Sequence, residues 1–208
     1  DNYFAWIETE DRDKTSVNCL GGRVDSPVKR QARPRVHKGL GPNLIHSVDG
    51  FVVREMARRC MFKEEVTTRV MDLILNPVGA FIYGTSGKSA DMVRTLWDWY
   101  LETGILSVRI LDFLYEDTMG LVDPMVVAKL LQSLPDQSFE LVTVHDCFRC
   151  HPNYGNDLRR QYNTILADIN DSTLLRSIAS QVVGKDVKVR KHGTIDREVI
   201  LNGNYLLG

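Results

Sequence analysis

The sequence predicts an α+β protein, with a small antiparallel sheet backed by helices and a mostly helical stretch inserted into it. Runs rich in β-branched and aromatic residues occur near the start of the chain and again at 139–144. Apolar residues at the three- and four-residue spacing of a helix fill most of the remainder. With 43% hydrophobic and 25% charged residues, the composition is that of a globular protein rather than a disordered one.

The first 20 residues predict a β-hairpin. Alternating apolar and polar residues favour strands at 3–9 and 16–20. The charged residues 10–14 are expected to form the turn between these strands, and Gly21 and Gly22 to form a second turn.

A cluster of basic residues follows this hairpin. The 26 basic and 27 acidic side chains give a formal net charge of −1, so the overall charge does not indicate nucleic acid as a partner. Lys29, Arg30, Arg33 and Arg35 nevertheless lie close together in the sequence. They predict a local phosphate-binding face whose affinity would fall with salt, and a solvated basic loop is the alternative.

A helix is expected from Pro42 onward, in the segment GLGPNLIHSVDGFVVR at 39–54. Its apolar residues recur at helical spacing, which predicts one buried face. They are Leu44, Ile45, Val48, Val52, Val53 and Met56. His46 precedes Asp49 by three residues, so both side chains are expected on one side of this helix.

Helical patterns fill the region between this helix and the strand at 139–144. Helices are expected at 63–75, 89–103, 105–117 and 123–133. Pro77 and Gly104 are the predicted stop signals of the first two. Asp123 and Pro124 are the predicted cap and first residue of the last helix.

The segment GTSGKS at 84–89 contains the Gly-Lys-Ser that ends a phosphate-binding P-loop. That loop has four residues between its glycines, which would require glycine at position 82, where this chain has Ile82. The spacing therefore favours a loop that precedes the next helix, with Lys88 near a phosphate as a further option.

The segment SFELVTVHDCFRCHP at 138–152 predicts a short buried strand that ends in a charged pair. Phe139, Leu141 and the following valines favour a strand, and His145 and Asp146 come at its tip. A carboxylate at the end of a rigid strand is a good ligand for Mg²⁺, which prefers oxygen donors. The alternative is a solvated aspartate in the turn of a hairpin.

The motif CFRCH at 147–151 has the spacing of a haem attachment site, and Cys147 and Cys150 have the spacing of half a zinc site. Zinc would require a second pair of ligands at similar spacing, whereas Cys19 and Cys60 are isolated in the sequence. The four cysteines form no convincing disulfide framework in a chain of 208 residues.

The last third of the chain predicts two helices and a final strand. The helices are expected at 156–169 and 171–183, with Gly184 as a stop signal. Five basic residues follow at 185–192. This segment has two interpretations, a charged connector or a contact with a nucleic-acid backbone. The run 199–207 is expected to be a strand.

PNLIHSVDG at 42–50 and VTVHDCF at 142–148, in this order, resemble the single-subunit DNA-dependent RNA polymerases of bacteriophages and mitochondria. The ending ILNGNYLLG is similar to the apolar, aromatic-containing terminus of these enzymes. The resemblance covers 1–59 and the last 70 or so residues, and 60–136 has no counterpart in it.

The resemblance implies a polymerase palm and nucleotidyl transfer with two Mg²⁺ ions. Asp146 is the implied metal ligand, and His145 is implied to shape the strand tip beside it. His46 and Asp49 are implied to lie on a helix along the primer-template, near the growing end of the RNA. The implied partners are a DNA template, the RNA product and ribonucleoside triphosphates.

The resemblance also implies an enzyme that is incomplete on its own. The family's first two motifs, which carry the other metal-binding aspartate and an Arg-Lys-Tyr helix, would precede the region where this sequence begins. A second polypeptide or fragment is expected to supply them. The chain would then consist of 1–59 with the His-Ser-x-Asp helix, a helical insertion at 60–136, and 137–208 with the His-Asp strand.

Two other classes of function remain open. One is a fragment of a family A DNA polymerase, because these enzymes also end a strand in Val-His-Asp. However, they usually have a glutamate where this chain has Cys147, and they lack the His-Ser-Val-Asp-Gly pattern that contains His46. A non-catalytic nucleic-acid-binding module would function without Asp146.

The sequence has no signal peptide and no transmembrane run. We therefore expect no membrane association and a location in the cytoplasm of a phage-infected host or in the mitochondrial matrix.

Overall fold

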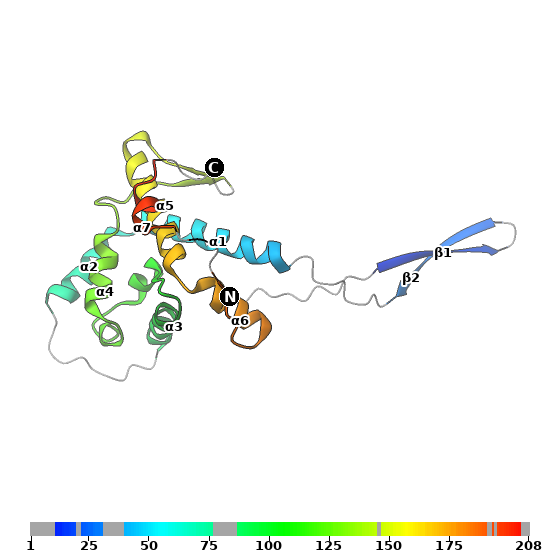
Figure 1. Ribbon diagram of the computed structural model, residues 1–208, viewed down its shortest axis with the longest axis horizontal. Coiled ribbons are helices and arrows are strands. Elements are labelled where there is room, and N and C mark those ends of the chain that lie inside the picture. Colours follow the sequence, from blue (N-terminus) through cyan, green and yellow to red (C-terminus); the bar gives the residue numbers. More distant parts are fainter. Residues whose placement is uncertain are drawn as a thin grey trace. The chain divides into compact units, whose positions relative to one another are not determined.

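The structure is a computed structural model that describes residues 11–19, 22–30, 40–76, 87–144, 147–190, 193 and 195–204 (Figure 1). The described residues are mostly helical and include two small antiparallel sheets of two strands each, which confirms the α+β class. The chain divides into two compact units, Asp1–Val48 and Asp49–Gly208. Among the described residues, no helix is both long enough and apolar enough to span a bilayer.

The first unit contains a hairpin whose position differs from the predicted one. Strand β1 (Asp11–Cys19) pairs with β2 (Gly22–Arg30), from Cys19 opposite Gly22 to Asp11 opposite Arg30. The predicted turn at 10–14 is wrong for residues 11–14, which belong to β1, because charged residues do not prevent backbone pairing. The glycine pair at 21–22 was the stronger turn signal. The predicted strand at 3–9 lies outside the described residues.

Helix α1 (Leu40–Cys60) confirms the helix predicted from Pro42. Its buried face is formed by Val52, Met56 and Cys60, each four residues after the previous one. Ile45 is 63% exposed, so the predicted buried face does not extend to the beginning of the helix. Only the second half of α1 therefore contributes to a hydrophobic core.

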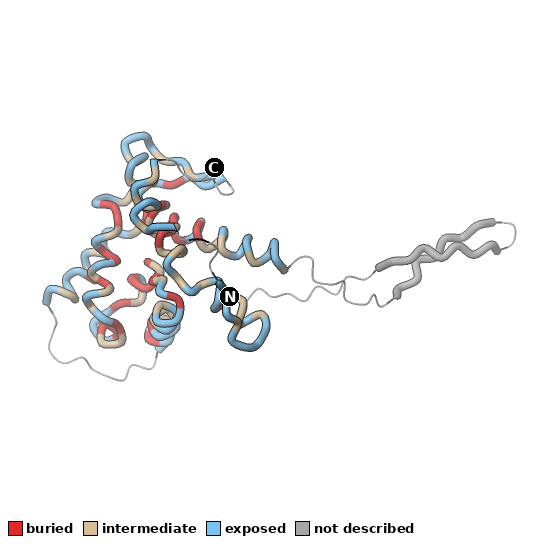
Figure 2. Tube along the Cα trace, viewed as in Figure 1, coloured by how far each residue is buried: buried red, intermediate tan, exposed pale blue. Residues whose placement is uncertain are grey.

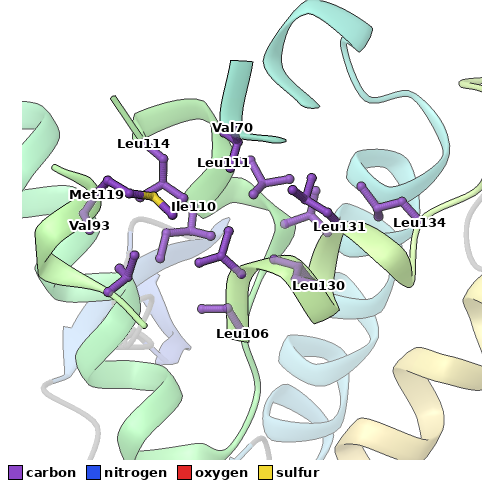
Figure 3. Packing of buried hydrophobic residues seen from close by; sticks show 13 residues of the cluster. Val70, Val93, Leu106, Ile110, Leu111, Leu114, Met119, Leu130, Leu131 and Leu134 are labelled. Carbon is purple, nitrogen blue, oxygen red and sulfur yellow. The ribbon is translucent and has the colours of Figure 1, made fainter. Parts of the chain in front are cut away.

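The helices between α1 and residue 139 share a hydrophobic core of their own. They are α2 (Glu64–Leu75), α3 (Lys88–Thr103), the 3₁₀ helices η1 (Val108–Phe113) and η2 (Met119–Leu121), and α4 (Pro124–Gln132). Ile110 and Leu111 of η1 lie between Val93 of α3 and Leu131 of α4 (Figure 3). Figure 2 shows buried and exposed residues alternating along these helices, as amphipathic helices require.

The predicted helix at 105–117 is wrong, because this region contains only the short 3₁₀ helix η1 and a turn, and the second 3₁₀ helix η2 follows it. Ser107 accepts a hydrogen bond from the Arg109 amide at 3.2 Å. The Thr118 hydroxyl donates to the Phe113 carbonyl at 2.8 Å and accepts from the Tyr115 amide at 2.8 Å. These side-chain bonds to the backbone compete with the bonds of a continuous α-helix. The expected helices at 63–75, 89–103 and 123–133 are confirmed within one residue at each end.

Three of the predicted helix signals act as expected. Gly104 ends α3 in the left-handed conformation, with φ of 82°, which glycine adopts without a steric penalty. Asp123 caps α4 by accepting a hydrogen bond from the Met125 amide at 2.8 Å, and Pro124 is the first helical residue.

Replacing Asp123 is expected to destabilise α4. Asp123→Ala removes the acceptor for the Met125 amide, which we expect to lower the free energy of unfolding by about 1 kcal/mol. Asp123→Asn keeps a side-chain acceptor and is expected to stay near the wild-type value. Urea unfolding followed by circular dichroism measures both variants. Equal midpoints for the alanine and asparagine variants would show that this cap contributes nothing.

A second core joins the later part of α1 to the segment before β3 and to α5 (Gly155–Asp171). Its buried residues come from these three parts of the chain. They are Val52, Met56, Cys60, Phe139, Leu141, Leu158 and Ile165. Strand β3 (Val142–Val144), strand β4 (Cys147–Arg149) and η3 (Pro152–Tyr154) lie between these core segments in the sequence.

The C-terminal region forms helices. Helix α6 (Leu174–Val183) ends at Gly184, which has φ of 71°, as the sequence predicts. The strand predicted at 199–207 is wrong at its start, because α7 (Arg197–Leu201) is a helix. Asp196 caps α7 by accepting from the Glu198 amide at 3.1 Å, and this local bond favours a helical turn. Residues 205–208 lie outside the described residues.

Candidate active site

The segment around the predicted metal ligand is a hairpin. In β3 and β4, Val144 pairs with Cys147, so only residues 145 and 146 separate the two strands. His145 and Asp146 themselves lie outside the described residues. Strand β3 ends at Val144, the residue before them, and their predicted place at the strand tip stays a prediction.

The prediction that this strand is buried is wrong for β3. Val142 is 53% exposed and Val144 is 50% exposed. Within the described part of the chain, β3 pairs with β4 alone, so no further strand covers it. The buried residues are Phe139 and Leu141, which precede β3. The apolar run is therefore anchored at its base and exposed toward its tip.

Two aromatic contacts hold the base of the hairpin against η3 and α5. The ring of Phe139 stacks on Tyr154, with centroids 4.8 Å apart and an interplanar angle of 5°. The ring of Phe148 in β4 contacts Tyr162 of α5 at 5.8 Å, with the planes tilted by 54°. Such pairs stabilise beyond the area that they bury. One aromatic contact lies before β3 and the other in β4, so both sides of the hairpin are fixed.

The hairpin is also attached to the end of α1. The Phe139 amide donates to the Cys60 carbonyl at 2.8 Å, and the Ser138 hydroxyl donates to the same carbonyl at 3.3 Å. Ser138 and Cys60 are 78 positions apart in the sequence. The helix that carries Asp49 and the hairpin that contains the segment with Asp146 therefore share one core.

A buried ion pair on α1 was not predicted from the sequence. Glu55 is 1% exposed and Arg59 is 3% exposed. The Glu55 carboxylate accepts hydrogen bonds from the Ser107 hydroxyl and the Val108 amide, both at 2.7 Å. Arg59 Nε lies 3.7 Å from Glu55 Oε1. Buried charges require such partners, because an isolated charge in a protein interior is very costly.

Arg59 extends this network to α5 and α7. Its Nη2 lies 3.7 Å from Oδ2 of Asp168, and the same carboxylate accepts from Arg197 of α7 at 2.8 Å. The hydrogen bonds to Asp168 and Asp171 raise the pKa of Arg197, although its partial burial opposes this shift. In the sequence, the spacing of Glu55 and Arg59 by four residues indicates an ion pair on one helix face. It does not indicate burial, because such pairs also occur on exposed helix surfaces.

The predicted nucleic-acid-binding residues are distributed over both units. His46 is exposed in the part of α1 that belongs to the first unit, and Asp49 is exposed at the start of the second. Lys29 and Arg30 are the last two residues of β2, where only the backbone is described. Arg33 and Arg35 lie outside the described residues. The prediction of a joint nucleic-acid surface therefore stays a prediction.

The cysteines of the hairpin form no metal site with described residues. In the described ranges, no group of three or more histidine, cysteine, aspartate or glutamate side chains could hold a metal ion. Cys147 is exposed, whereas Cys150 packs against the second core beside the buried Cys60. His151 Nδ1 accepts from the Asn153 amide at 3.4 Å, as the cap of η3. The CFRCH segment is thus part of the hairpin and the following turn.

The described thiols are expected to differ in reactivity. Burial, and then the nearby Cys150, raise the pKa of Cys60 to about 12. At pH 8 only about one Cys60 thiol in ten thousand would be the reactive thiolate. We expect iodoacetamide to modify the exposed Cys147 in the folded protein and Cys60 only after unfolding in urea. Peptide mapping by mass spectrometry measures this, and rapid labelling of Cys60 in the folded protein would contradict it.

A separate pocket of about 1050 Å³ lies between α2, the start of α3 and the turn after η1. Arg69 lines it and lies 4.2 Å from the ring centre of Tyr115. The other charged lining residues are the carboxylates Glu64, Glu65, Asp72, Glu116 and Asp117. This excess of negative charge disfavours a phosphate group, although Ser89 of the GTSGKS segment is among the lining residues.

No protein-family model matches the sequence, and no curated protein matches it. The resemblance to single-subunit RNA polymerases therefore rests on the two motifs around Asp49 and Asp146 and on the ending of the chain.

Proposed function

We propose that this chain is the C-terminal part of a single-subunit DNA-directed RNA polymerase, with Asp146 as a ligand of the catalytic Mg²⁺ ions. The observation that supports this most is the shared core of α1 and the β3–β4 hairpin. One motif of the resemblance ends on α1 just before the residues that enter this core, and the other lies on the hairpin, far away in the sequence. A chance match of two short motifs gives no reason for their elements to pack together.

The donor groups available in this chain fit part of a Mg²⁺ site. Asp146 supplies one carboxylate, and Mg²⁺ usually keeps several waters when one or two carboxylates bind it. Two bound ions would stabilise the attacking and the leaving oxygen of nucleotidyl transfer. The resemblance implies a further metal-binding carboxylate, from the family's first motif, which a second polypeptide or fragment would supply. The chain would then be one part of a heteromeric enzyme.

The proposed nucleic-acid contacts are exposed or basic residues. His46 and Asp49 are exposed on α1, where polar side chains are available to a template–product duplex. In the minor groove such a duplex offers mostly acceptor atoms that differ little between base pairs. These contacts would therefore recognise the geometry of the duplex rather than its base sequence. Lys29 and Arg30, with Arg33 and Arg35, would add contacts to phosphates.

Native mass spectrometry and an extension assay together test this proposal. The protein is purified from its source, its complexes are weighed, and each is assayed for Mg²⁺-dependent extension of an RNA primer on a DNA template. We expect a second polypeptide to copurify and the complex to extend RNA with ribonucleotides, but not after removal of Mg²⁺ by EDTA. A stable complex that binds template and never extends RNA would instead favour a non-catalytic binding module.

A further inference from the structure

Arg59 lies at a junction of three helical segments. Its Nη1 donates to the hydroxyl of Ser133, just after α4, and to the side-chain carbonyl of Gln161 in α5, both at 3.2 Å. Gln161 is fully buried, and its Nε2 donates to the Ser133 carbonyl at 2.8 Å. One guanidinium therefore joins α1, α5 and the end of α4. The planar fork of arginine can hold several acceptors at fixed angles, which a lysine ammonium cannot do.

This junction is one residue away from each side of the hairpin. On α1, the residue after Arg59 is Cys60, whose carbonyl accepts from the Phe139 amide ahead of β3. On α5, the residue after Gln161 is Tyr162, whose ring contacts Phe148 in β4. A shift of α5 relative to α1 would therefore move the two sides of the hairpin relative to each other.

We propose that Arg59, acting through Gln161, is a positioning residue that fixes the β3–β4 hairpin relative to α1. This role rests on the proposed function, because its purpose is to hold Asp146 at the place where the Mg²⁺ ions bind. Arg59 and Gln161 touch neither substrate nor metal in this role. They act by fixing the position of the β3–β4 hairpin, which would hold the metal ions, relative to α1, which would contact the duplex.

A role in stability alone makes a different prediction. Replacing a buried ion pair by apolar residues of similar volume is often neutral or stabilising, so burial by itself does not explain these polar contacts. Gln161→Leu removes the hydrogen bond from Arg59 to Gln161 and leaves the contacts of Arg59 with Glu55 and Asp168 in place. This variant is therefore expected to fold even if Arg59→Lys does not. Asp123→Ala, which weakens the cap at the opposite end of α4 from Ser133, is the control for loss of stability.

The test compares these variants in the complex with the second polypeptide. Primer extension gives kcat and the Mg²⁺ concentration for half-maximal rate, and filter binding gives the affinity for template. For Gln161→Leu we expect kcat to fall at least about tenfold and the Mg²⁺ requirement to rise, because small misplacements of reacting groups are costly. Template affinity is expected to stay unchanged. Asp123→Ala is expected to keep kcat within about twofold, because it lies away from the hairpin contacts.

Hydrogen exchange provides a readout that does not depend on catalysis. The Phe139 amide, which is bonded to Cys60, is expected to exchange faster in Gln161→Leu than in Asp123→Ala. If Gln161→Leu matches Asp123→Ala in kcat, Mg²⁺ requirement and exchange, the positioning role is wrong while the polymerase function stands. If the wild-type complex itself never extends RNA, the proposed function fails and this role fails with it.

Discussion

The Asp146→Asn complex is expected to bind its DNA template normally and to extend RNA on the order of a hundredfold more slowly, or worse. A bound metal ion contributes several kcal/mol to stabilising the transition state, and each 1.36 kcal/mol corresponds to a factor of ten in rate. Template binding depends on many contacts to the phosphate backbone, which replacing one carboxylate by an amide does not remove. Single-turnover primer extension and filter binding measure the two properties separately.

Glu140→Gln is the matched control for this substitution. Glu140 is an exposed carboxylate two residues before β3, so the change is chemically the same and close in the sequence. We expect this variant to extend RNA at nearly the wild-type rate. If Asp146→Asn also keeps a nearly normal rate, the metal-binding role of Asp146 is wrong and the non-catalytic module becomes the better description.

Glu55→Ala is expected to have the largest effect on stability. The change removes the acceptor of two hydrogen bonds of 2.7 Å, from Ser107 and Val108. It also leaves Arg59 buried without its partner on α1, and breaking a buried ion pair in this way costs about 3–5 kcal/mol. Urea unfolding of the purified protein, followed by circular dichroism, measures the loss. We also expect a lower midpoint of thermal unfolding.

Glu65→Ala provides the comparison for an exposed glutamate. Glu65 lies in the first turn of α2 and is exposed. Substitutions of this kind usually change the free energy of unfolding by no more than about 0.5 kcal/mol. An equally small effect for Glu55→Ala would mean that water reaches the Glu55 carboxylate and that the ion pair is not buried in solution.

Local signals in the sequence predicted the helices well, because the chemistry of a helix end is local. Asp123, Gly104 and Gly184 act on backbone groups within a few residues of themselves, so their effect can be read from the sequence. The first hairpin and α7 were mispredicted where two local signals competed. At the first hairpin a charged run competed with a glycine pair, and at α7 a capping aspartate competed with β-branched residues.

The candidate site was only partly predictable, because most of what supports it comes from contacts between distant segments. The end of a strand at Val144 was expected, and His145 and Asp146 follow it directly. The burial of Glu55 could not be foreseen, because its partners Ser107 and Val108 lie more than 50 positions later in the chain. A charged residue on a helix is expected in solvent unless its distant partners are known.

The chain leaves the second core at Cys60 and returns to it at Ser138 and Phe139, which bond to the Cys60 carbonyl. A segment whose two ends meet can change in length without moving the elements on either side, as insertions in natural proteins do. Here the segment also supplies Ser107 and Val108 to Glu55 and Ser133 to Arg59. A chain without this segment would therefore need uncharged residues at positions 55 and 59. The length of the segment and the charges on the buried face of α1 have to change together in evolution.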